Sequence, residues 1–315
     1  MGEERTNRIS VVLAADDNYA QHAAVAMASV LANTAVPEQV AFWLIDDGIS
    51  SRNKDKVRQT AARWHSRVSF LTIKNKELEQ GFVSGPISRT AYFRLDIPDI
   101  VPADVERVIY LDCDLLVLDD IRLLWQTDLA GNPLGAAEDP GILTSAGKKR
   151  NKTEAFGWRE EDSYFNSGVL VIDVAQWRVR DYAKQLRALL AKNRYRHHDQ
   201  DALNELFEGH WTPIPLRWNV IPPVFHLGWG VLKDTRARRQ ALEALRDAAI
   251  VHYAGGYKPW EYDCKPGFNE KYYGYLHLSV FKDAVMPQPG KNKSHSWSHE
   301  AARLRWAAFW NKVLP

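Results

Sequence analysis

The sequence predicts an α/β fold with a mainly parallel central sheet. Two observations support this prediction: short apolar runs alternate with segments whose apolar residues recur at helical spacing, and several of the runs end in acidic residues. In sheets of this kind, ligands bind beyond the carboxyl ends of the strands, where the strand order reverses. We therefore expect the functional residues at those strand ends.

The amino-terminal third alternates strand and helix in order. Strands are expected at 8–15, 39–45 and 67–73, because each range is a short run rich in apolar residues, and Asp16 and Asp46 close the first two. The apolar spacing and the capping residues then predict two helices, which are Tyr19–Asn33 and one that runs through His65 from a cap at Ser50 or Ser51.

The later elements carry further polar residues at their ends. Strands are expected at 107–117, 168–172 and 248–253, and a helix is expected from Asp199 to Phe207. The first of these strands contains the pair Asp112 and Asp114, and the last one contains His252 near its end.

Composition excludes several classes of protein. The 315 residues are 45% hydrophobic and 25% charged, as in an ordinary globular chain, and the net charge of +2 argues against a nucleic-acid partner. The chain has 2 cysteines, Cys113 and Cys264, which cannot form a disulfide framework, so a reducing compartment is expected. No apolar signal region follows Met1, and no apolar run is long enough to span a bilayer. We expect a cytoplasmic protein.

The acidic pair is the most informative motif. Asp112 and Asp114 interrupt an apolar run, and buried carboxylates are costly unless a cation pairs with them. His252 is a candidate third ligand, and a carboxylate–imidazole set with open positions suits Mn²⁺ better than Zn²⁺, with Mg²⁺ as a substitute. The alternatives are a solvated turn for the pair and a histidine that bonds to the backbone at its strand end.

A glycine-containing loop follows the candidate histidine. Gly255 and Gly256 permit close backbone approach to phosphate oxygens, and Lys258 adds a positive charge beside them. The sequence contains no phosphate loop of the Gly-X-X-X-X-Gly-Lys type, no dinucleotide fingerprint, no nucleophile elbow and no zinc helix. A diphosphate held jointly by a metal and this loop is the expectation that remains.

Five motifs occur in an order that resembles a known family. They are Ala14-Ala15-Asp16-Asp17-Asn18-Tyr19, Tyr110-Leu111-Asp112-Cys113-Asp114, Phe165-Asn166-Ser167-Gly168-Val169-Leu170, Asp199-Gln200-Asp201-Ala202-Leu203-Asn204 and the run from His252 to Trp260. Together they resemble glycosyltransferase family 8, the bacterial lipopolysaccharide galactosyltransferase and glucosyltransferase group. The resemblance covers residues 9–260. It implies a GT-A fold and a retaining transfer of a hexose, galactose or glucose, from a UDP-sugar with Mn²⁺.

The resemblance also implies roles for individual residues. The metal ligands would be Asp112, Asp114 and His252. The cofactor-binding positions would be Ala14, Asp16, Asn18, Asp112, Cys113, Gly255 and Lys258. The donor-sugar and catalytic positions would be Arg94, Asp139, Asn166, Asp199 and Gln200.

Some of these positions have simpler readings. Strand alternation predicts that the thiol of Cys113 packs away from the carboxylates and is not a ligand. Arg94 is alternatively a partner of a surface acid, Asn166 and Asp139 are alternatively turn residues, and Asp199 is alternatively a helix N-cap.

Retention of configuration usually indicates a carboxylate nucleophile. The position where the family resemblance places such a group is Gln200, an amide, which is a poor nucleophile. A front-face reaction is therefore expected, in which the acceptor hydroxyl attacks from the side of the leaving group.

The chain changes character after Met286. The domain is expected to span residues 1–286, and Pro287-Gln288-Pro289-Gly290 reads as a linker to a tail at 287–315. The tail is basic and rich in tryptophan at helical spacing, which suits an anionic membrane surface. Such a helix would attach the protein to the inner face of the cell membrane, near a glycolipid acceptor; alternatively it packs on the domain.

Two rival functions are kept open at this stage. One is a non-catalytic sugar-nucleotide-binding or stress protein. The other is an Asp-X-Asp phosphohydrolase, although that class expects a small hydroxyl residue after the pair, where this chain has Leu115.

Overall fold

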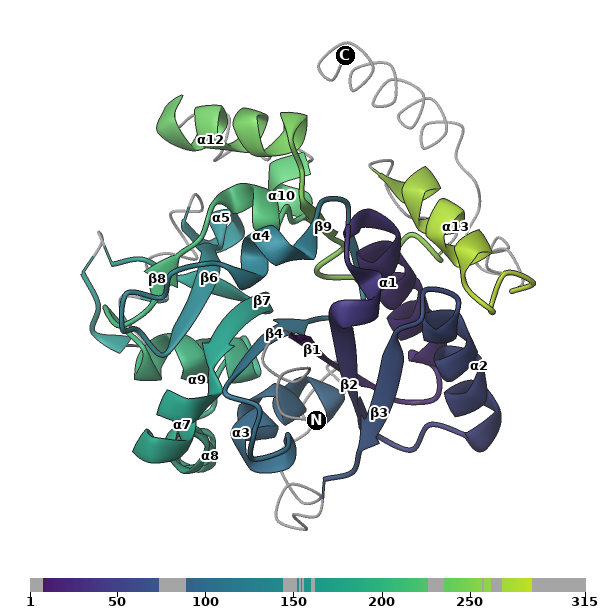
Figure 1. Cartoon of the computed structure of the whole chain (residues 1–315). Helices are drawn as coiled ribbons and strands as arrows, with labels where there is room; N and C mark the ends of the chain where they lie inside the picture. The colour runs from purple at the N-terminus through teal and green to yellow at the C-terminus, as the bar shows by residue number, and fades with distance from the viewer. Residues whose placement is uncertain are drawn as a thin grey trace, which may run out of the picture.

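A single mixed sheet organises the molecule (Figure 1). The computed structural model describes residues 8–73, 89–143, 152, 154, 156–159, 162–225, 235–256, 258–261 and 268–284. The strands of the sheet, in spatial order, are β3 (Arg67–Leu71), β2 (Val40–Asp46), β1 (Ile9–Ala15), β4 (Arg107–Leu111), β7 (Phe165–Asp173), β6 (Leu134–Glu138) and β8 (Thr212–Pro213). All neighbours are parallel except that β7 runs antiparallel to β4 and β6. The predicted mainly parallel α/β sheet is confirmed.

Helices cover both faces of the sheet, because alternate residues of each buried strand point to opposite sides. One core includes Val11 and Leu13 of β1 and lies under α1 (Ala20–Asn33), α2 (Ser51–Ala62) and α13 (Asn269–Leu278). The other includes Val12 of β1 and lies against helices on the opposite face, which are α3 (Ile97–Ile100), α7 (Val174–Arg180), α8 (Tyr182–Lys192) and α9 (His198–Leu206).

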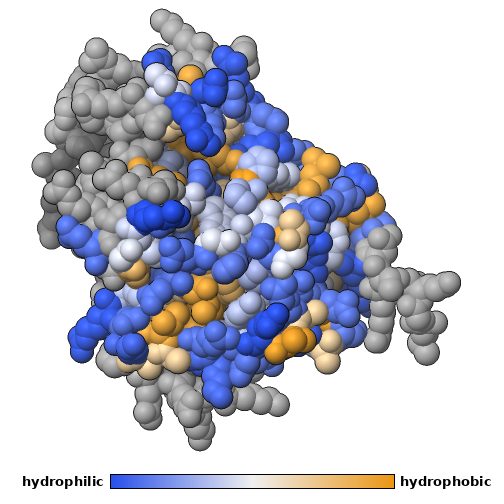
Figure 2. All heavy atoms as spheres, turned by 90° about the vertical axis from the view of Figure 1, so that its left-hand side faces the viewer, coloured by the Kyte–Doolittle hydropathy of each residue, from blue (hydrophilic) through white to orange (hydrophobic). Residues whose placement is uncertain are grey.

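The remaining elements are short or lie at the edges of the sheet. They are the 3-10 helices η1 (Pro37–Gln39), η3 (Arg89–Asp96) and η4 (Leu216–Trp218) and the α-helices α4 (Ile121–Trp125), α5 (Pro140–Leu143), α10 (Pro222–Phe225) and α12 (Thr235–Arg246). The face drawn in Figure 2 is mostly hydrophilic, with hydrophobic residues in small separate groups, which is typical of a surface in contact with water.

The predicted strand 107–117 is wrong as a single element. The chain leaves the sheet after Leu111 and resumes as a separate strand, β5 (Leu115–Val117), which pairs antiparallel with β9 (Ile250–His252). In that two-stranded sheet Leu115 lies opposite His252. The break therefore puts the acidic pair on a turn and brings the histidine beside it.

Other element boundaries differ by a few residues. The second helix ends at Ala62 and not at His65, and its cap is Ser50, whose Oγ accepts a hydrogen bond from the Asn53 amide at 3.3 Å. The helix expected from Asp199 begins one residue earlier, with His197 at the N-cap, so Asp199 lies in its first turn. The N-cap alternative for Asp199 is wrong.

Two expectations concern the end of the chain. The tail at 287–315 lies outside the described residues, so the domain boundary at 286 stays a prediction. Within the part of the chain that the structure describes, no helix combines the length and the apolar character needed to cross a bilayer.

Candidate active site

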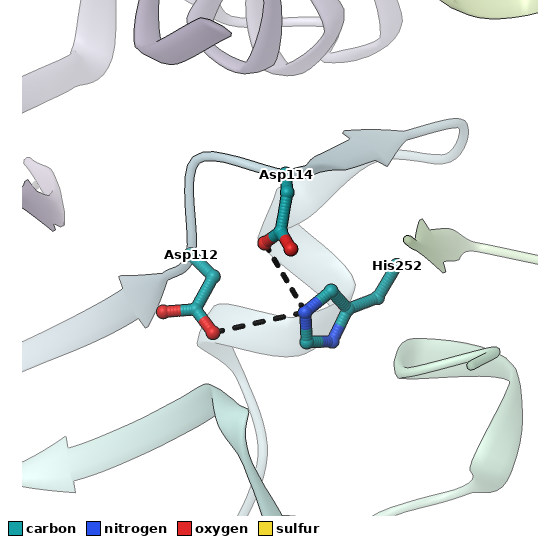
Figure 3. Close-up of side chains that lie close together, drawn as sticks. All are labelled: Asp112, Asp114 and His252. Atoms are coloured by element: carbon teal, nitrogen blue, oxygen red, sulfur yellow. Dashed lines mark ion pairs between the residues drawn. The ribbon is translucent and has the colours of Figure 1, made fainter. Parts of the chain in front are cut away.

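Three candidate metal ligands converge at the break between β4 and β5 (Figure 3). Asp112 and Asp114 lie on the turn, and His252 reaches them from the end of β9. His252 Nε2 lies 3.2 Å from Asp114 Oδ1 and 3.7 Å from Asp112 Oδ2. One donor atom of each residue lies within 4.8 Å of the others, close enough for all three to contact one cation. The structure thus brings together the three residues that the sequence predicted as metal ligands.

A chain of amides determines which nitrogen of His252 faces the carboxylates. The Gly168 amide donates to Asn166 Oδ1 at 3.0 Å, so that oxygen is an acceptor, and Asn219 Nδ2 donates to it at 2.9 Å. Asn219 Oδ1 then lies 2.9 Å from His252 Nδ1, which must carry a proton to bond to it. In the neutral ring, the lone pair is on Nε2 and points at two carboxylates. The lone pair and the two carboxylates repel one another, and a cation bound between Nε2 and the carboxylate oxygens would remove that repulsion. A hydrogen bond that orients the ring in this way is typical of a histidine that binds a metal.

Gly168 makes room for this arrangement. A Cβ at this position would lie 2.2 Å from His252 Cε1 and 2.8 Å from Asp112 Oδ2. Both atoms belong to side chains that are held by other partners, so neither can move away without breaking a contact. The glycine after Ser167 is needed for packing against the imidazole, and its φ is not in the left-handed region.

Lys258 brings a positive charge to the same turn. Its ammonium pairs with Asp114 Oδ2 and donates to the Tyr253 backbone oxygen at 2.7 Å. Burial alone would raise the pKa of Asp114, but the ammonium of Lys258 beside it outweighs burial and holds that pKa well below its ordinary value. Asp114 is therefore ionised. Gly255, between His252 and Lys258, has a φ of 92°, a conformation that favours glycine.

Arg94 connects the metal candidates to the helix α9. Its guanidinium contacts Asp112 Oδ1 and Asp199 Oδ2, each at 3.0 Å, and donates to the Ser167 backbone oxygen at 2.6 Å. The group is buried and lies 4.7 Å from the centre of the Tyr110 ring. Burial opposes its charge, but the two carboxylates outweigh burial and raise the pKa of Arg94. The surface-pair alternative for Arg94 is wrong.

Of the partners of Arg94, Asp199 has a carboxyl group with a raised pKa. Burial raises the pKa of Asp199 to about 6, although Arg94 acts in the opposite direction. Asp112 also receives a hydrogen bond from the Tyr110 hydroxyl at 2.8 Å. This part of the site therefore holds two carboxylates around one guanidinium, with Arg94 and Asp199 buried and Asp112 partly exposed.

Gln200 is the centre of a second network. Its Oε1 accepts from the Ser167 amide at 3.1 Å, which fixes the orientation of the side-chain amide. Its Nε2 then donates to Asp139 Oδ2 and to the Tyr164 hydroxyl, each at 3.2 Å. The Tyr164 hydroxyl is free to accept because it donates its own proton to Asp201 Oδ1 at 2.6 Å.

Asn166 and Asp139 belong to the same network. Asn166 Nδ2 donates to Asp139 Oδ2 at 3.3 Å and to Gln200 Oε1 at 3.2 Å. Asp139 Oδ1 accepts from the amides of Gly141 and Ile142 at the start of α5. Asp139 and Asn166 are both buried. Asp139 lies between β6 and α5, as the turn alternative expects, whereas Asn166 lies inside β7, so the turn alternative is wrong for Asn166.

The part of the site at the end of β1, where the family resemblance places the nucleotide, is more open. Asp16 and Asn18 follow β1, where Asn18 is exposed and Asp16 Oδ1 accepts from the Tyr19 amide at 2.8 Å. Cys113 is buried, and its thiol donates to the Ala14 backbone oxygen at 3.1 Å. The predicted packing role of the thiol is confirmed, and Cys113 is not a member of the metal group among the described residues.

Sequence reasoning missed three residues of this site. Asn219, which orients His252, comes from the segment around η4, where no motif was recognised. Gly168 lies within a recognised motif and Tyr164 directly precedes that motif, but their roles depend on groups brought together by the fold. A buried Asn in an apolar run was the only sequence signal for Asn219.

The sheet topology together with the acidic pair at its break defines the class. A mainly parallel sheet with helices on both faces, and an Asp-X-Asp turn facing a histidine at its ligand-binding edge, is the GT-A architecture of glycosyltransferases. The sequence matches the model of glycosyl transferase family 8 over residues 10–264, and the chain belongs to that family.

Individual relatives agree with this assignment. The chain is 31% identical to General stress protein A of Bacillus subtilis over 88% of its own length and 96% of that protein. It is 26% identical to the lipopolysaccharide 1,2-glucosyltransferase of Escherichia coli over 91% of its own length and 80% of that protein. The structure of the galactosyltransferase LgtC in complex with donor and acceptor sugar analogs superposes with a TM-score of 0.74 at 30% identity, covering 89% of this chain and 98% of that one.

Proposed function

We propose that the protein is a retaining, Mn²⁺-dependent glycosyltransferase that moves galactose or glucose from a UDP-sugar to a saccharide acceptor, in lipopolysaccharide or another glycolipid. The observation that supports it best is the convergence of Asp112, Asp114 and His252 beside Lys258, at the edge of the sheet where such folds bind ligands.

The charges of the site fit a divalent cation. Among the described residues, the carboxylates of Asp112, Asp114 and Asp199 lie around the cationic side chains of Arg94 and Lys258. Three carboxylates around two cationic side chains leave one negative charge without a cationic partner. Two carboxylates and one imidazole leave coordination positions for phosphate oxygens, which suits Mn²⁺ or Mg²⁺. When bound, such an ion neutralises the charge that develops on the leaving diphosphate.

The chain's own residues would act around that diphosphate. Lys258 would exchange part of its contact with Asp114 for a phosphate oxygen, and the open backbone at Gly255 would allow the phosphates to approach. Asp16 and Asn18 would contact the uridine. Arg94, Asp139, Asn166 and Asp199 would bind and orient the hexose, with Asp199 and Arg94 held in place by their mutual ion pair.

The environment of Gln200 favours the front-face route. Its amide oxygen accepts hydrogen bonds from Ser167 and Asn166, which withdraw electron density from the lone pairs that a nucleophile would need. In the front-face route, the acceptor hydroxyl forms the new bond to the anomeric carbon as the phosphate leaves from the same side. The hydroxyl proton passes to the leaving phosphate.

Release of UDP tests the activity. UDP-galactose and UDP-glucose are each supplied with saccharide acceptors, with Mn²⁺ or with a chelator. We expect that one of the two donors gives steady UDP release, and that this release requires Mn²⁺. The Asp114→Asn variant should lose the release. Equal release with the chelator would contradict the metal-dependent proposal.

The Gln200→Ala variant tests the route. Turnover should fall but remain measurable, because Gln200 orients the sugar and forms no bond to it. Complete loss of turnover with unchanged binding of the UDP-sugar would instead support a covalent role for this position.

A sugar-nucleotide-binding protein without transfer activity is the second candidate. The relative named General stress protein A, at 31% identity, is the observation that favours it. UDP release distinguishes the two candidates. A protein that only binds would bind UDP in the presence of Mn²⁺ but would release no UDP from a UDP-sugar, whichever acceptor is supplied.

The tail is proposed as the membrane contact. Sedimentation with anionic liposomes, comparing the full chain with one that ends at Met286, tests this part separately. Equal sedimentation of both proteins would contradict a membrane role for residues 287–315.

A further inference from the structure

The loop that carries Lys258 ends in a cluster of aromatic rings outside the site described above. Trp260 stacks on His22 of α1, with ring centres 3.6 Å apart and planes 16° from parallel. The Tyr272 ring of α13 lies 5.2 Å from Trp260, and the Tyr19 ring lies 6.0 Å from it, edge to face. Two helices that are distant in sequence thus hold one end of the loop.

The protonation state of His22 suits a stacking role. The Tyr272 hydroxyl lies 2.7 Å from His22 Nδ1 and accepts a hydrogen bond from Gln21 Nε2 at 3.4 Å. When the phenolic proton is directed at His22 Nδ1, the imidazole proton lies on Nε2. Burial lowers the pKa of His22 to about 4, so the ring is neutral near pH 7. A neutral, oriented ring stacks on an indole without bringing an unpaired charge into the core.

The described part of the loop is held at Tyr253 and Pro259 and is open at Gly255 and Gly256. The Tyr273 hydroxyl of α13 donates to the Pro259 backbone oxygen at 2.7 Å, and the Tyr253 hydroxyl donates to the Phe268 backbone oxygen at 2.8 Å. At Gly255 and Gly256, an added Cβ would meet no atom within 4 Å. Two glycines in open space supply no side-chain contacts of their own. The ammonium of Lys258 is held by Asp114 and by the Tyr253 backbone oxygen, and the backbone that follows Lys258 is held by the contacts at Pro259 and Trp260.

We propose that His22 is a positioning residue for the diphosphate end of the donor. By stacking on Trp260, it holds residues 258–261 where Lys258 reaches the acidic turn, before any donor binds. This inference rests on the proposed function for its biological meaning, but the stacking and its effect on the loop are measurable without turnover.

Hydrogen exchange and UDP binding test the proposal together. In His22→Ala, we expect faster amide exchange within 253–261 and a dissociation constant for UDP with Mn²⁺ that rises about three- to tenfold, the effect of losing one aromatic pair. His22→Phe keeps a flat ring and should restore both values to near those of the wild type. His277→Ala, at an exposed position on α13, is the matched control and should change neither.

Kinetics separate positioning from a general structural effect. The KM for the UDP-sugar should rise in His22→Ala while kcat changes little, because the bound diphosphate restores the loop position at a cost in affinity. Should His22→Ala fail to fold, Trp260→Ala removes the same stack from the loop side. Unchanged exchange and unchanged UDP affinity in the folded variant would overturn the proposal. Absence of transfer in the wild type, with the loop effects intact, would contradict only the proposed function.

Discussion

The two sides of the site hold their polar residues in opposite ways. On the proposed sugar side, Arg94, Asn166 and Asp199 are buried and bonded to other residues of the site, and Gln200 makes several such bonds. On the proposed nucleotide side, Asn18 is exposed just after the end of β1. The first group is arranged by folding, whereas the second is available to a ligand.

This difference separates stability from binding. Burying charged and amide groups requires that each finds a partner, so removing one member of the sugar-side network leaves its neighbours unsatisfied. An exposed residue on the nucleotide side leaves only water behind when it is removed. Substitutions on the sugar side should therefore lower stability and activity together, and those on the nucleotide side should lower binding alone.

Gly168→Ala should have the largest effect. The new Cβ would overlap the His252 ring, so His252 or Asp112 must move, at a cost of about 1–3 kcal/mol in the free energy of unfolding and with loss of the metal site. Chemical denaturation and Mn²⁺ titration measure the two effects. Gly274→Ala in α13, where a Cβ would meet no atom within 4 Å, is the control and should cost nothing in metal affinity. Unaltered Mn²⁺ affinity in Gly168→Ala would contradict the packing argument.

Asn219→Ala should have the next largest effect. It removes the acceptor that orients His252 Nδ1, and loss of such a partner typically lowers metal affinity about 10- to 100-fold. Calorimetric titration with Mn²⁺ measures this. Asn132→Ala removes a hydrogen bond to Thr212 Oγ1 away from the site and should leave Mn²⁺ affinity unchanged. Equal affinities in the two variants would argue against an orienting role for Asn219.

Asn18→Ala tests the nucleotide side. We expect UDP affinity to fall about fivefold to tenfold, the effect of one hydrogen bond, and the free energy of unfolding to change by less than about 0.5 kcal/mol. Titration with UDP and thermal unfolding measure the two quantities. A large loss of stability in this variant would remove the distinction between the two sides.

Asp120→Asn shows what a carboxylate contributes when it has a structural role only. Asp120 lies outside the site, caps α4 and accepts hydrogen bonds from Arg122 and Thr34. Burial opposes its ionisation, but these donors lower the pKa of Asp120 to about 2. Because the folded pKa lies below the ordinary value of 3.8, its contribution is complete above about pH 4 and is lost as the pH falls through about 2. Partial exposure limits it to about 1 kcal/mol.

Urea unfolding at several pH values checks this prediction. The wild type and Asp120→Asn should differ by about 1 kcal/mol at pH 7 and converge toward pH 2, with unchanged UDP affinity throughout. A difference that grows as the pH falls would have the wrong sign.

Much of the site was predictable because its residues stand at strand ends. Asp112, Asp114 and His252 interrupt or close apolar runs, and buried strands do not tolerate such groups without a reason. Their grouping in the structure agrees with the metal prediction, while their roles in binding remain a prediction. The break between β4 and β5 was not predictable, because residues 107–117 are apolar on both sides of the pair and read as one strand.

The sequence alone determined the α/β class, the ligand-binding edge and the acidic pair, since strand and helix periodicity and the cost of buried charge are local properties of the chain. Only the tertiary structure decided that Asn219 orients His252, that Gly168 must lack a side chain, and that His22 stacks on Trp260. In each case the two residues in contact are far apart in the sequence. No local pattern shows which distant groups will meet when the sheet and its helices pack together.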